Sequence, residues 1–320
     1  MRLIAGVLVR VRRIGREIAR RVVRLMAVRP WSRGLLNAMY RRLSANQRGY
    51  WHRRFAKLFR ERPHPGVCGG KWRVDFAGRE IVVPLVADRY WLDWDTALSV
   101  VGHDLEVKET YGAILQSPQR PELFVDIGGN YGTHSLLFLV SRIPAITVEP
   151  NPSCHRFFRE LCASNRVEPR LEPVAIGAVP GHVDLSYPER DTWLGATNAE
   201  TTSKLLAGQQ ALVTVRVKQR TVDDYLADMG AARTLLKIDT EGNELAVLQG
   251  ATRTLRVVRP TIVFECDPDA CRAEIFALLA AVNYAIHLLP WSPAGSASPL
   301  TQEQFVASQF DNFVAVPQAV

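Results

Sequence analysis

The sequence predicts an α/β protein whose core is a parallel sheet covered by helices on both faces, preceded by a basic helical extension. From residue 123 onward, short apolar runs alternate with stretches of helical periodicity, which is typical of parallel strands buried on both sides. With 320 residues, of which 47% are hydrophobic, the chain is long enough to bury a large core without a metal or disulfide scaffold. The apolar runs expected as strands are residues 123–127, 145–149, 171–176, 234–239 and 261–266.

Charge is divided unevenly between the extension and the body. Residues 1–62 hold 18 Lys and Arg against two acids, a net charge of +16, whereas residues 63–320 carry a net charge of −8. We therefore expect an anionic partner to contact the extension. The five cysteines form no C-x-x-C pair and include an odd one, so neither a zinc site nor a disulfide framework is indicated, and a reducing cytoplasmic setting fits best.

Residues 3–26 are predicted to form an amphipathic helix, because apolar side chains recur at steps of three and four with arginines on the other side. Such a helix either lies on an anionic membrane surface or packs on the protein body or a partner, and periodicity does not distinguish the two. Arginines interrupt every apolar stretch, so neither a signal peptide nor a spanning helix is expected. The protein is predicted to be cytoplasmic, with peripheral attachment to the inner face of the membrane left open. The apolar positions are Ile4, Val7, Val11, Ile14, Ile18, Val22 and Leu25.

The region before the main domain divides at a cluster of helix and strand breakers. Residues 31–60 interleave aromatic and basic residues, a composition that suits either RNA binding or the buried face of a helix. The segment RPHPG at 62–66 marks a predicted boundary. The expected divisions are an extension at 1–62, N-terminal strands and a helix at 63–120, and the main domain at 121–320. Further elements are expected at 72–76, 80–86, 182–187, 212–218, 285–289 and 312–316 as strands and at 96–116 as a helix.

The strongest local motif is a glycine-rich turn, DIGGNYG at 126–132, between the first of these strands and a helix predicted at 133–142. Such a turn brings backbone amides close to a ligand. It lacks the G-x-G-x-x-G spacing, and the carboxylate of Asp126 disfavours a pyrophosphate but suits a ligand with an ammonium and a sulfonium. Glu149 ends the next apolar run, where an acid accepts hydrogen bonds from ribose hydroxyls. These two acids predict S-adenosylmethionine as the ligand, with a plain strand, turn and helix as the alternative.

A second acidic motif, KIDTEGNE at 237–244, spans the end of another predicted strand. Acids at the carboxyl end of a buried strand lie where open α/β sheets bind ligands. Desolvation and mutual repulsion there raise the pKa of a carboxyl group toward neutrality, which a general base requires. Asp239 ends the strand and is expected to face the crevice. Glu241 and Glu244 also suit the first turn of a helix, and this structural role is the one we favour for Glu244.

The order of these motifs resembles the FkbM-type methyltransferases over about residues 105–316. The resemblance implies a Rossmann-like class I methyltransferase sheet of seven strands with an antiparallel last strand. It also implies S-adenosylmethionine as methyl donor and, usually, O-methylation of a hydroxyl on a sugar, lipid or polyketide. Gly129 departs from the Ala that is common in the family. The motifs are DIGGNYG, EPNP at 149–152, AIG at 175–177, TVDDYL at 221–226, KIDTEGNE, LQGA at 248–251, RP at 259–260 and FE at 264–265.

Carried over by position, the resemblance assigns a role to each candidate site residue. The methionine part of the cofactor would contact Asp126, Gly128, Asn130 and Gly132, the ribose Glu149, the adenine surroundings Asn151 and Ile176, and the methyl-transfer crevice Asp239. The candidates for a base that takes the hydroxyl proton are Asp239, His134 and Glu241. A divalent cation shared by Asp239 and Asp267 is open, but no metal is expected because Pro268 offers no side-chain oxygen.

Three functions follow from these patterns. The leading one is an S-adenosylmethionine-dependent O-methyltransferase that acts on a small-molecule, glycan, lipid-linked or secondary-metabolite acceptor. The alternatives are an RNA methyltransferase whose basic extension holds nucleic acid, although nucleic acid is not the partner we expect, and an inactive membrane-attached scaffold. The acceptor itself is not predicted, because acceptor pockets are built from variable loops such as residues 188–210.

Overall fold

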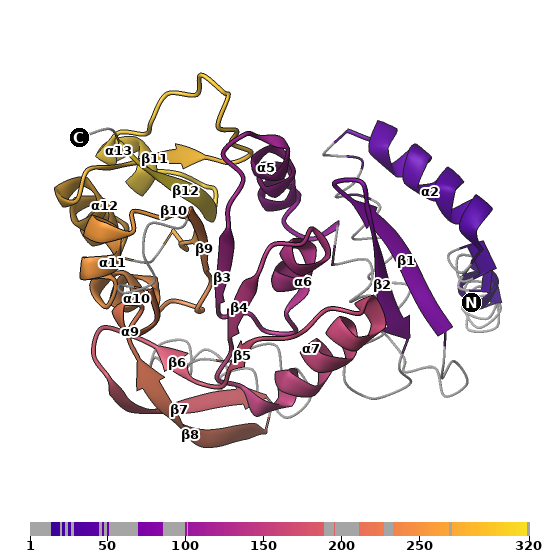
Figure 1. Cartoon of the computed structure of the whole chain (residues 1–320), viewed down its shortest axis with the longest axis horizontal. Helices are drawn as coiled ribbons and strands as arrows, with labels where there is room; N and C mark the ends of the chain where they lie inside the picture. Colours follow the sequence, from indigo (N-terminus) through magenta and orange to yellow (C-terminus); the bar gives the residue numbers. More distant parts are fainter. Residues whose placement is uncertain are drawn as a thin grey trace, which may run out of the picture. The chain divides into compact units, whose positions relative to one another are not determined.

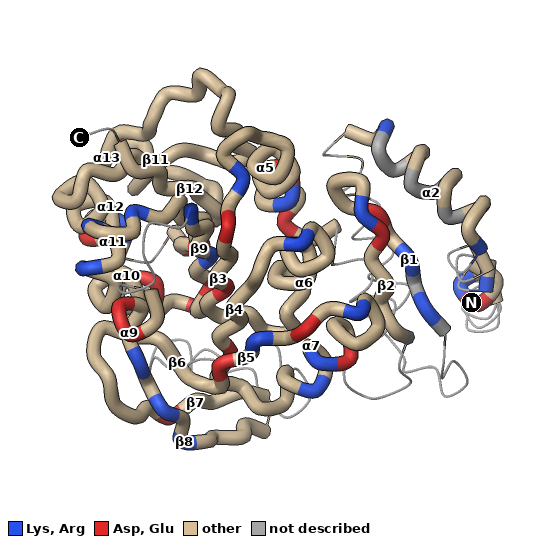
Figure 2. Tube along the Cα trace, viewed as in Figure 1, with Lys and Arg blue, Asp and Glu red and all other residues tan. Residues whose placement is uncertain are grey.

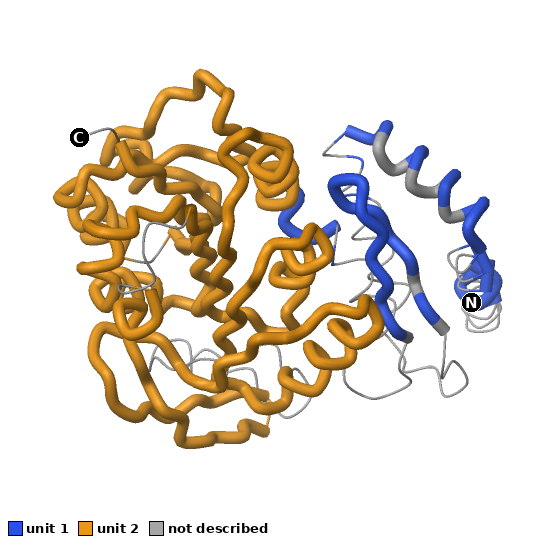
Figure 3. Tube along the Cα trace, viewed as in Figure 1, with its two compact units in different colours: residues 1–105 blue, residues 106–320 orange. Residues whose placement is uncertain are grey.

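A computed structural model of the chain divides into two compact units, Met1–Leu105 and Glu106–Val320, shown in separate colours in Figure 3. The boundary predicted at 62–63 lies outside the described residues. No helix in the described part of the chain is long and apolar enough to cross a bilayer. The residues that the structure describes are 14–19, 21–22, 25–26, 29–44, 47, 50, 70–85, 100, 102–188, 195, 211–226, 233–268 and 271–318.

The first unit begins with helical segments, which agree with the amphipathic helix predicted from the sequence. The predicted helix is helical wherever it is described, and its residues 3–13 lie outside the described part. Helix α2 (Pro30–Arg42) follows it. The side chain of Ser32 joins the two, because its Oγ donates to the carbonyl oxygens of Met26, at 2.7 Å, and Arg29, at 3.2 Å.

The rest of the described first unit is a hairpin of β1 (Gly70–Phe76) and β2 (Arg79–Leu85), which pair antiparallel. This confirms the two strands expected at 72–76 and 80–86. Ala77 and Gly78, which connect them, have φ values of 46° and 78°, as a tight two-residue hairpin turn requires. Alternate residues of both strands are buried, so one face of the hairpin is packed.

The second unit is built on a seven-stranded sheet with the order β11-β12-β10-β9-β3-β4-β5 (Figure 1). All neighbouring pairs are parallel except those made by β12, which is antiparallel to both β10 and β11. The predicted class I methyltransferase sheet with a reversed last strand is therefore confirmed. The strands are β3 (Leu123–Ile127), β4 (Ala145–Val148), β5 (Leu171–Glu172), β9 (Thr234–Ile238), β10 (Thr261–Glu265), β11 (Tyr284–Leu288) and β12 (Asn312–Pro317).

Helices connect and cover these strands. The helix expected at 133–142 is α6, and the described end of the helix expected at 96–116 is α5. Every residue of β3, β4 and β9 is buried, as in parallel sheets covered on both faces. The helices are α5 (Leu105–Gln116), α6 (Thr133–Val140), α7 (Pro152–Asn165), α9 (Asp223–Leu226), α10 (Glu244–Gln249), α11 (Thr252–Val257), α12 (Arg272–Ala281) and α13 (Gln302–Val306).

The apolar run expected as one strand at 171–176 is divided between two sheets. Its first part, β5, ends the large sheet, and its second part, β6 (Ala175–Ile176), pairs with β8 (Leu212–Arg220) in a three-stranded sheet. Pro173 lies between the two parts, and proline has no amide hydrogen to donate to a neighbouring strand. The third strand of the small sheet is β7 (Gly181–Pro188), so both strands predicted within the insertion are confirmed.

A buried arginine fixes the end of the large sheet. Arg272, on the first turn of α12, is 1% exposed, and its guanidinium donates five hydrogen bonds to backbone carbonyl oxygens. Two acceptors follow β10, one lies in α13, and two lie between α13 and β12, so Arg272 holds the segment that leads into β12 against the end of β10. They belong to Cys266, Asp267, Phe305, Ser308 and Phe310.

Candidate active site

A pocket with an empty volume of about 670 Å³, part of it open to solvent, lies at the carboxyl ends of β3, β4, β6 and β9. Open α/β sheets place their ligands at this edge. The acidic residues that line it, Glu149, Asp239 and Glu241, follow β4 and β9. Figure 2 shows acidic positions along the chain near these strands. Among the residues predicted for the site, the lining includes Gly128, Asn130, Glu149, Asn151, Ile176, Asp239 and Glu241, whereas Asp126, Gly132 and His134 do not line it.

The turn after β3 passes so close to β9 that it leaves no room for a side chain. Gly128 has φ of 77°, and a Cβ atom there would lie 1.6 Å from the backbone oxygen of Asp239. Its amide and that of Gly129 both donate to the carbonyl oxygen of Val148, at 3.0 Å each. A Cβ at Gly129 would lie 2.3 Å from the methyl group of Thr147, so this threonine occupies the space that an alanine side chain would need. The turn thus binds the ends of β4 and β9 together and presents main chain to the pocket.

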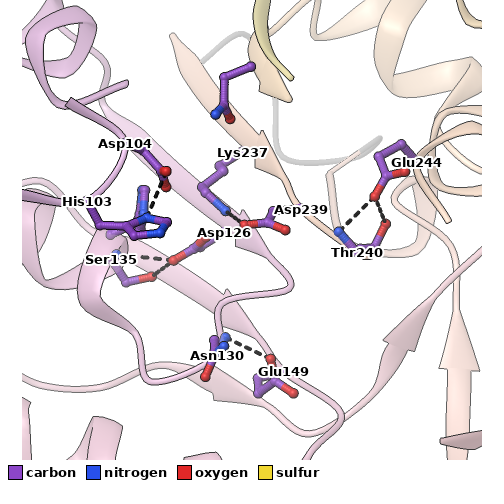
Figure 4. A network of polar contacts seen from close by, with 12 residues as sticks. His103, Asp104, Asp126, Asn130, Ser135, Glu149, Lys237, Asp239, Thr240 and Glu244 are labelled. Atoms are coloured by element: carbon purple, nitrogen blue, oxygen red, sulfur yellow. Dashed lines mark hydrogen bonds and ion pairs between the residues drawn. The ribbon is translucent and has the colours of Figure 1, made fainter. Parts of the chain in front are cut away.

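Glu149, directly after β4, holds the two segments that flank the pocket. Its Oε2 accepts from the amide of Asn130 at 2.7 Å (Figure 4), and its Oε1 accepts from the amide of Asn151 at 2.6 Å. Burial raises the pKa of this carboxyl to about 7, against the opposing effect of the two amides. Each carboxylate oxygen keeps a further acceptor position, so Glu149 is able to accept from a ligand as well.

Asn130, Asn151 and Ile176 line the pocket while also fixing the chain around it. The side chain of Asn151 accepts from the amide of Ser153 at 3.0 Å and so caps α7. Asn130 has φ of 50°, and its Oδ1 accepts from the thiol of Cys154 at 3.4 Å. The carbonyl oxygen of Ile176 accepts from the side chain of Asn243, another lining residue, at 3.1 Å.

Asp126 and Gly132, at the two ends of the motif, do not line the pocket, and the ligand contacts that the resemblance implies for them stay predictions. Asp126 is fully buried, and its Oδ2 accepts from the amide and hydroxyl of Ser135, at 3.1 and 2.8 Å. Its Oδ1 has no hydrogen-bond partner among the described residues, and burial raises its pKa. Gly132 has φ of 70° and lies so close to the ring of Phe158 that a Cβ atom would stand 2.0 Å from it.

A buried lysine pairs with the acid that ends β9. The Nζ of Lys237 lies 2.8 Å from the Oδ2 of Asp239, and Figure 4 shows the two side chains pointing toward each other. Burial alone would lower the pKa of Lys237, but the carboxylates of Asp239 and Asp126 outweigh it and raise that pKa. Lys237 is therefore a permanent cation between two acids.

Glu265 completes this cluster from the neighbouring strand. Parallel pairing of Phe264 with Ile238 brings the next residues, Glu265 and Asp239, side by side at the ends of β10 and β9. The negative charge of Asp239 and burial raise the pKa of Glu265 far above its usual range, and its side chain hydrogen-bonds Asp239. The two carboxyl groups therefore share a hydrogen bond beside the cation of Lys237, and the raised pKa of Glu265 favours Glu265 as its donor.

Glu241 has the strained backbone and the shifted pKa that often accompany a functional role. Its φ is 53°, in the left-handed region, and the residue is exposed where it borders the pocket. Desolvation of its carboxyl, followed by the charges of Asp239 and Glu244, raises its pKa to about 7. Glu244 has the structural role expected of it, because its Oε1 accepts from Thr240 and Gly242 at the start of α10.

His134 is held by α5 and does not border the pocket. Its Nε2 lies 3.1 Å from the Nζ of Lys108, and its Nδ1 lies 3.2 Å from the hydroxyl of Tyr111. The ring is buried, edge-on to Tyr111, with centroids 5.7 Å apart. The structure therefore brings Asp239 and Glu241 together but sets His134 apart from them.

Sequence reasoning missed the roles of Lys237 and Glu265. The signal for Lys237 was present, since a lysine inside an otherwise apolar buried strand needs a carboxylate partner. Glu265 carried no such signal, because its contact with Asp239 depends on which strands are neighbours. Among the described residues, no group of three or more His, Cys, Asp or Glu is arranged to hold a metal ion.

Comparison with known proteins agrees with this architecture. Residues 126–285, half of the chain, match the family described as the methyltransferase FkbM domain. The chain belongs to the FkbM methyltransferase family. The match starts at the aspartate before the glycine-rich turn and includes the acidic motif after β9, so the resemblance inferred from these motifs is confirmed.

Individual relatives are distant. The hexuronic acid methyltransferase AglP of Haloferax volcanii is 26% identical over 152 residues, which are 47% of this chain and 58% of that protein, so the chain spans little more than half of its length. The structure of the methyltransferase FkbM from Methylobacillus flagellatus is 15% identical, with a TM-score of 0.38 over 69% of this chain and 54% of that one. A SAM-dependent methyltransferase from Agrobacterium tumefaciens is 11% identical, with a TM-score of 0.37 over 78% of this chain and 71% of that one.

S-adenosylmethionine is the cofactor of this FkbM family member, and the pocket fits it. Glu149 offers carboxylate oxygens suited to ribose hydroxyls, and Val148, Val174 and Ile176 offer an apolar surface suited to an adenine ring. The ionised Asp239 borders the same pocket and suits the positive charge of the methionine part.

Proposed function

We propose that this FkbM family member is an O-methyltransferase that acts on a hydroxyl of a glycan, lipid-linked or secondary-metabolite acceptor. The observation that carries the proposal is the position of two carboxylates, Asp239 and Glu241, which both line the pocket after β9, and desolvation raises the pKa of Glu241 to about 7. A base with such a pKa is half deprotonated at neutral pH and suits the removal of a hydroxyl proton. A sugar acceptor is supported by the hexuronic acid methyltransferase to which the chain is similar.

In this mechanism Glu241 and Asp239 have different tasks. S-adenosylmethionine, held by Asn130, Glu149 and Asn151, would supply the methyl group for transfer to the acceptor hydroxyl. The carboxylate of Glu241 accepts the proton that the hydroxyl loses. Asp239 is a poor base, because Lys237 and Glu265 stabilise its ionised form, and it serves instead to hold positive charge in the pocket. Positioning of the two reactants supplies much of the remaining rate.

His134 is left out of this mechanism because both of its ring nitrogens contact α5 and it does not line the pocket. Asn130, Asn151 and Glu149 are proposed to bind the cofactor, whereas Asp126 and Gly132 are proposed to support the turn that carries Gly128. The substrate loop expected at 188–210 lies outside the described residues apart from Pro188 and Gly195.

Two measurements test the proposal. Calorimetric titration with S-adenosylhomocysteine is expected to show binding that Glu149→Ala weakens, and absence of binding to the wild-type protein would identify an inactive scaffold. Mass spectrometry of glycolipids and glycans from cells with and without the protein is expected to show a species that gains a methyl group. Methyl transfer to RNA instead, abolished by truncation of residues 1–62, would assign the RNA function and overturn the proposal.

A further inference from the structure

The helical segments of the first unit expose two apolar stripes. Ile14, Ile18, Val22 and Leu25 follow one another at steps of four, four and three, and each is about half exposed. Residues at these steps share one face of a helix. The predicted apolar face is therefore present wherever the helix is described, and the described part of the first unit leaves it exposed.

The second stripe lies on α2, where Trp31, Leu35 and Met39 are spaced by four residues. Trp31 is 66% exposed and Met39 is 65% exposed, although aromatic and aliphatic residues of such helices are usually buried. The helix contacts β1, and Ser32, next to Trp31, is 1% exposed. α2 is thus anchored to its unit while this stripe remains open.

The charge around the stripes decides which occupant they suit. Arg16 and Arg21 on the first helix and Arg42 on α2 are exposed, within a segment of net charge +16. A second copy of the chain would bring the same positive charge against this surface, which disfavours pairing of like faces. RNA would complement the positive charge of this segment, but it has no apolar region in which the isoleucine and leucine side chains could be buried. An anionic lipid surface matches both features, since arginines bind phosphates while apolar side chains enter the acyl boundary.

We propose that these two stripes form a lipid-docking surface, defined by Ile14, Ile18, Val22, Leu25, Trp31, Leu35 and Met39, that binds anionic membranes. The exposed Trp31 fits this role, because tryptophan is enriched at the membrane–water interface. The proposal does not depend on the methyl acceptor, because it rests only on residues of the first unit.

Vesicle flotation with the full chain tests the lipid-docking surface. Binding is expected to vesicles of phosphatidylcholine with phosphatidylglycerol but not to phosphatidylcholine alone, and to weaken as salt screens the arginines. Ile18→Asp and Leu35→Asp are each expected to lower the partition coefficient at least about tenfold, since each places a charge in the acyl boundary. The matched control is Val257→Asp, which changes an exposed valine of α11, 62% exposed, and is expected to have no effect.

Two further readouts separate this proposal from its competitors. Brominated lipids are expected to quench the fluorescence of the wild-type protein more than that of Trp31→Phe, because Trp31 enters the bilayer. All variants are expected to keep the helical circular dichroism of the wild type, which reports on the first unit, and to bind S-adenosylhomocysteine as the wild type does, which reports on the second unit. Equal flotation of Ile18→Asp, Leu35→Asp and the wild type would overturn the proposal. So would self-association, seen by sedimentation velocity without lipid, that both variants abolish, since a second copy would then be the occupant.

Discussion

Replacing Lys237 by methionine removes the cation that stands between two carboxylates under the pocket. In the wild type its Nζ lies 2.8 Å from Asp239, and the charge of the lysine also lowers the pKa of Asp126, which is wholly buried. Lys237→Met keeps most of the side-chain volume but leaves both acids without their positive neighbour. Breaking a buried ion pair from one side costs about 3–5 kcal/mol. We expect a loss near 3 kcal/mol in the free energy of unfolding, because the side chain of Asp239 is 31% exposed and partly solvated.

The loss in the free energy of unfolding caused by Lys237→Met is expected to depend on pH, because the carboxyl groups near Lys237 titrate. The pKa of Asp126 is already raised by burial in the wild type, and removing the charge of Lys237, which lowers it, raises that pKa further. A carboxyl whose pKa is higher in the folded state destabilises that state above its unfolded pKa, increasingly as pH rises through the folded pKa. The variant is therefore expected to lose about 3 kcal/mol at pH 8 and clearly less at pH 5, where protonation relieves the repulsion.

Urea unfolding followed by circular dichroism at both pH values measures this effect. The transition of the second unit is recognised by its shift when S-adenosylhomocysteine is added, since a ligand stabilises the unit that binds it. Lys218→Met, which changes an exposed lysine of β8, is the control and is expected to stay within about 0.5 kcal/mol of the wild type. A loss below about 1 kcal/mol at pH 8, or equal losses at pH 5 and 8, would refute the assignment of Lys237 as a necessary counter-charge.

Three further substitutions test other parts of the argument. Glu241→Gln is expected to lower the rate of methyl transfer by about 100 to 10,000-fold and to remove the rise of kcat/KM through pH 7. A pH dependence of kcat/KM equal to that of the wild type would show that another group is the base. Gly128→Ala is expected to abolish S-adenosylhomocysteine binding in calorimetry, because its Cβ atom would lie 1.6 Å from the backbone oxygen of Asp239. Gly181→Ala is the control, since a Cβ atom there has no neighbour within 4 Å. Binding retained by Gly128→Ala would contradict the close approach of the turn to β9. Arg272→Met is expected to cost about 3–5 kcal/mol in urea unfolding because it removes five buried hydrogen bonds to backbone carbonyl oxygens. The exposed Arg256→Met is expected to cost no more than about 0.5 kcal/mol, and equal values for the two variants would contradict a structural role of Arg272.

The fold was largely predictable because its signals are local. The apolar runs that form β3, β4, β9 and β10 are short, buried on both faces and separated by helices, so each strand is recognisable from its local sequence. The division of the run at 171–176 was the exception. Pro173 indicates a break in this run, but the pairing of its two parts, β5 and β6, depends on the strands beside them in two different sheets.

The candidate site was less predictable because its contacts cross between strands. Asp239 and Glu265 are remote in sequence and meet only because β9 and β10 are neighbours. His134 shows the opposite case, since it follows the glycine-rich turn directly yet faces α5 instead of the pocket. A position near a motif fixes distance along the chain but not the direction of a side chain on the first turn of a helix.

The place of β12 has a consequence for how the chain is made. β12 pairs with β10 on one side and β11 on the other, yet it follows both of them in sequence. While a ribosome is still adding the residues of β12, β10 and β11 lack the strand that lies between them. The edge of β10 then exposes unpaired backbone amides and carbonyls beside apolar side chains. The nascent sheet is then most open to aggregation. Substitutions that delay insertion of β12 should lower the yield of folded protein in cells more than they lower the activity of the molecules that do fold.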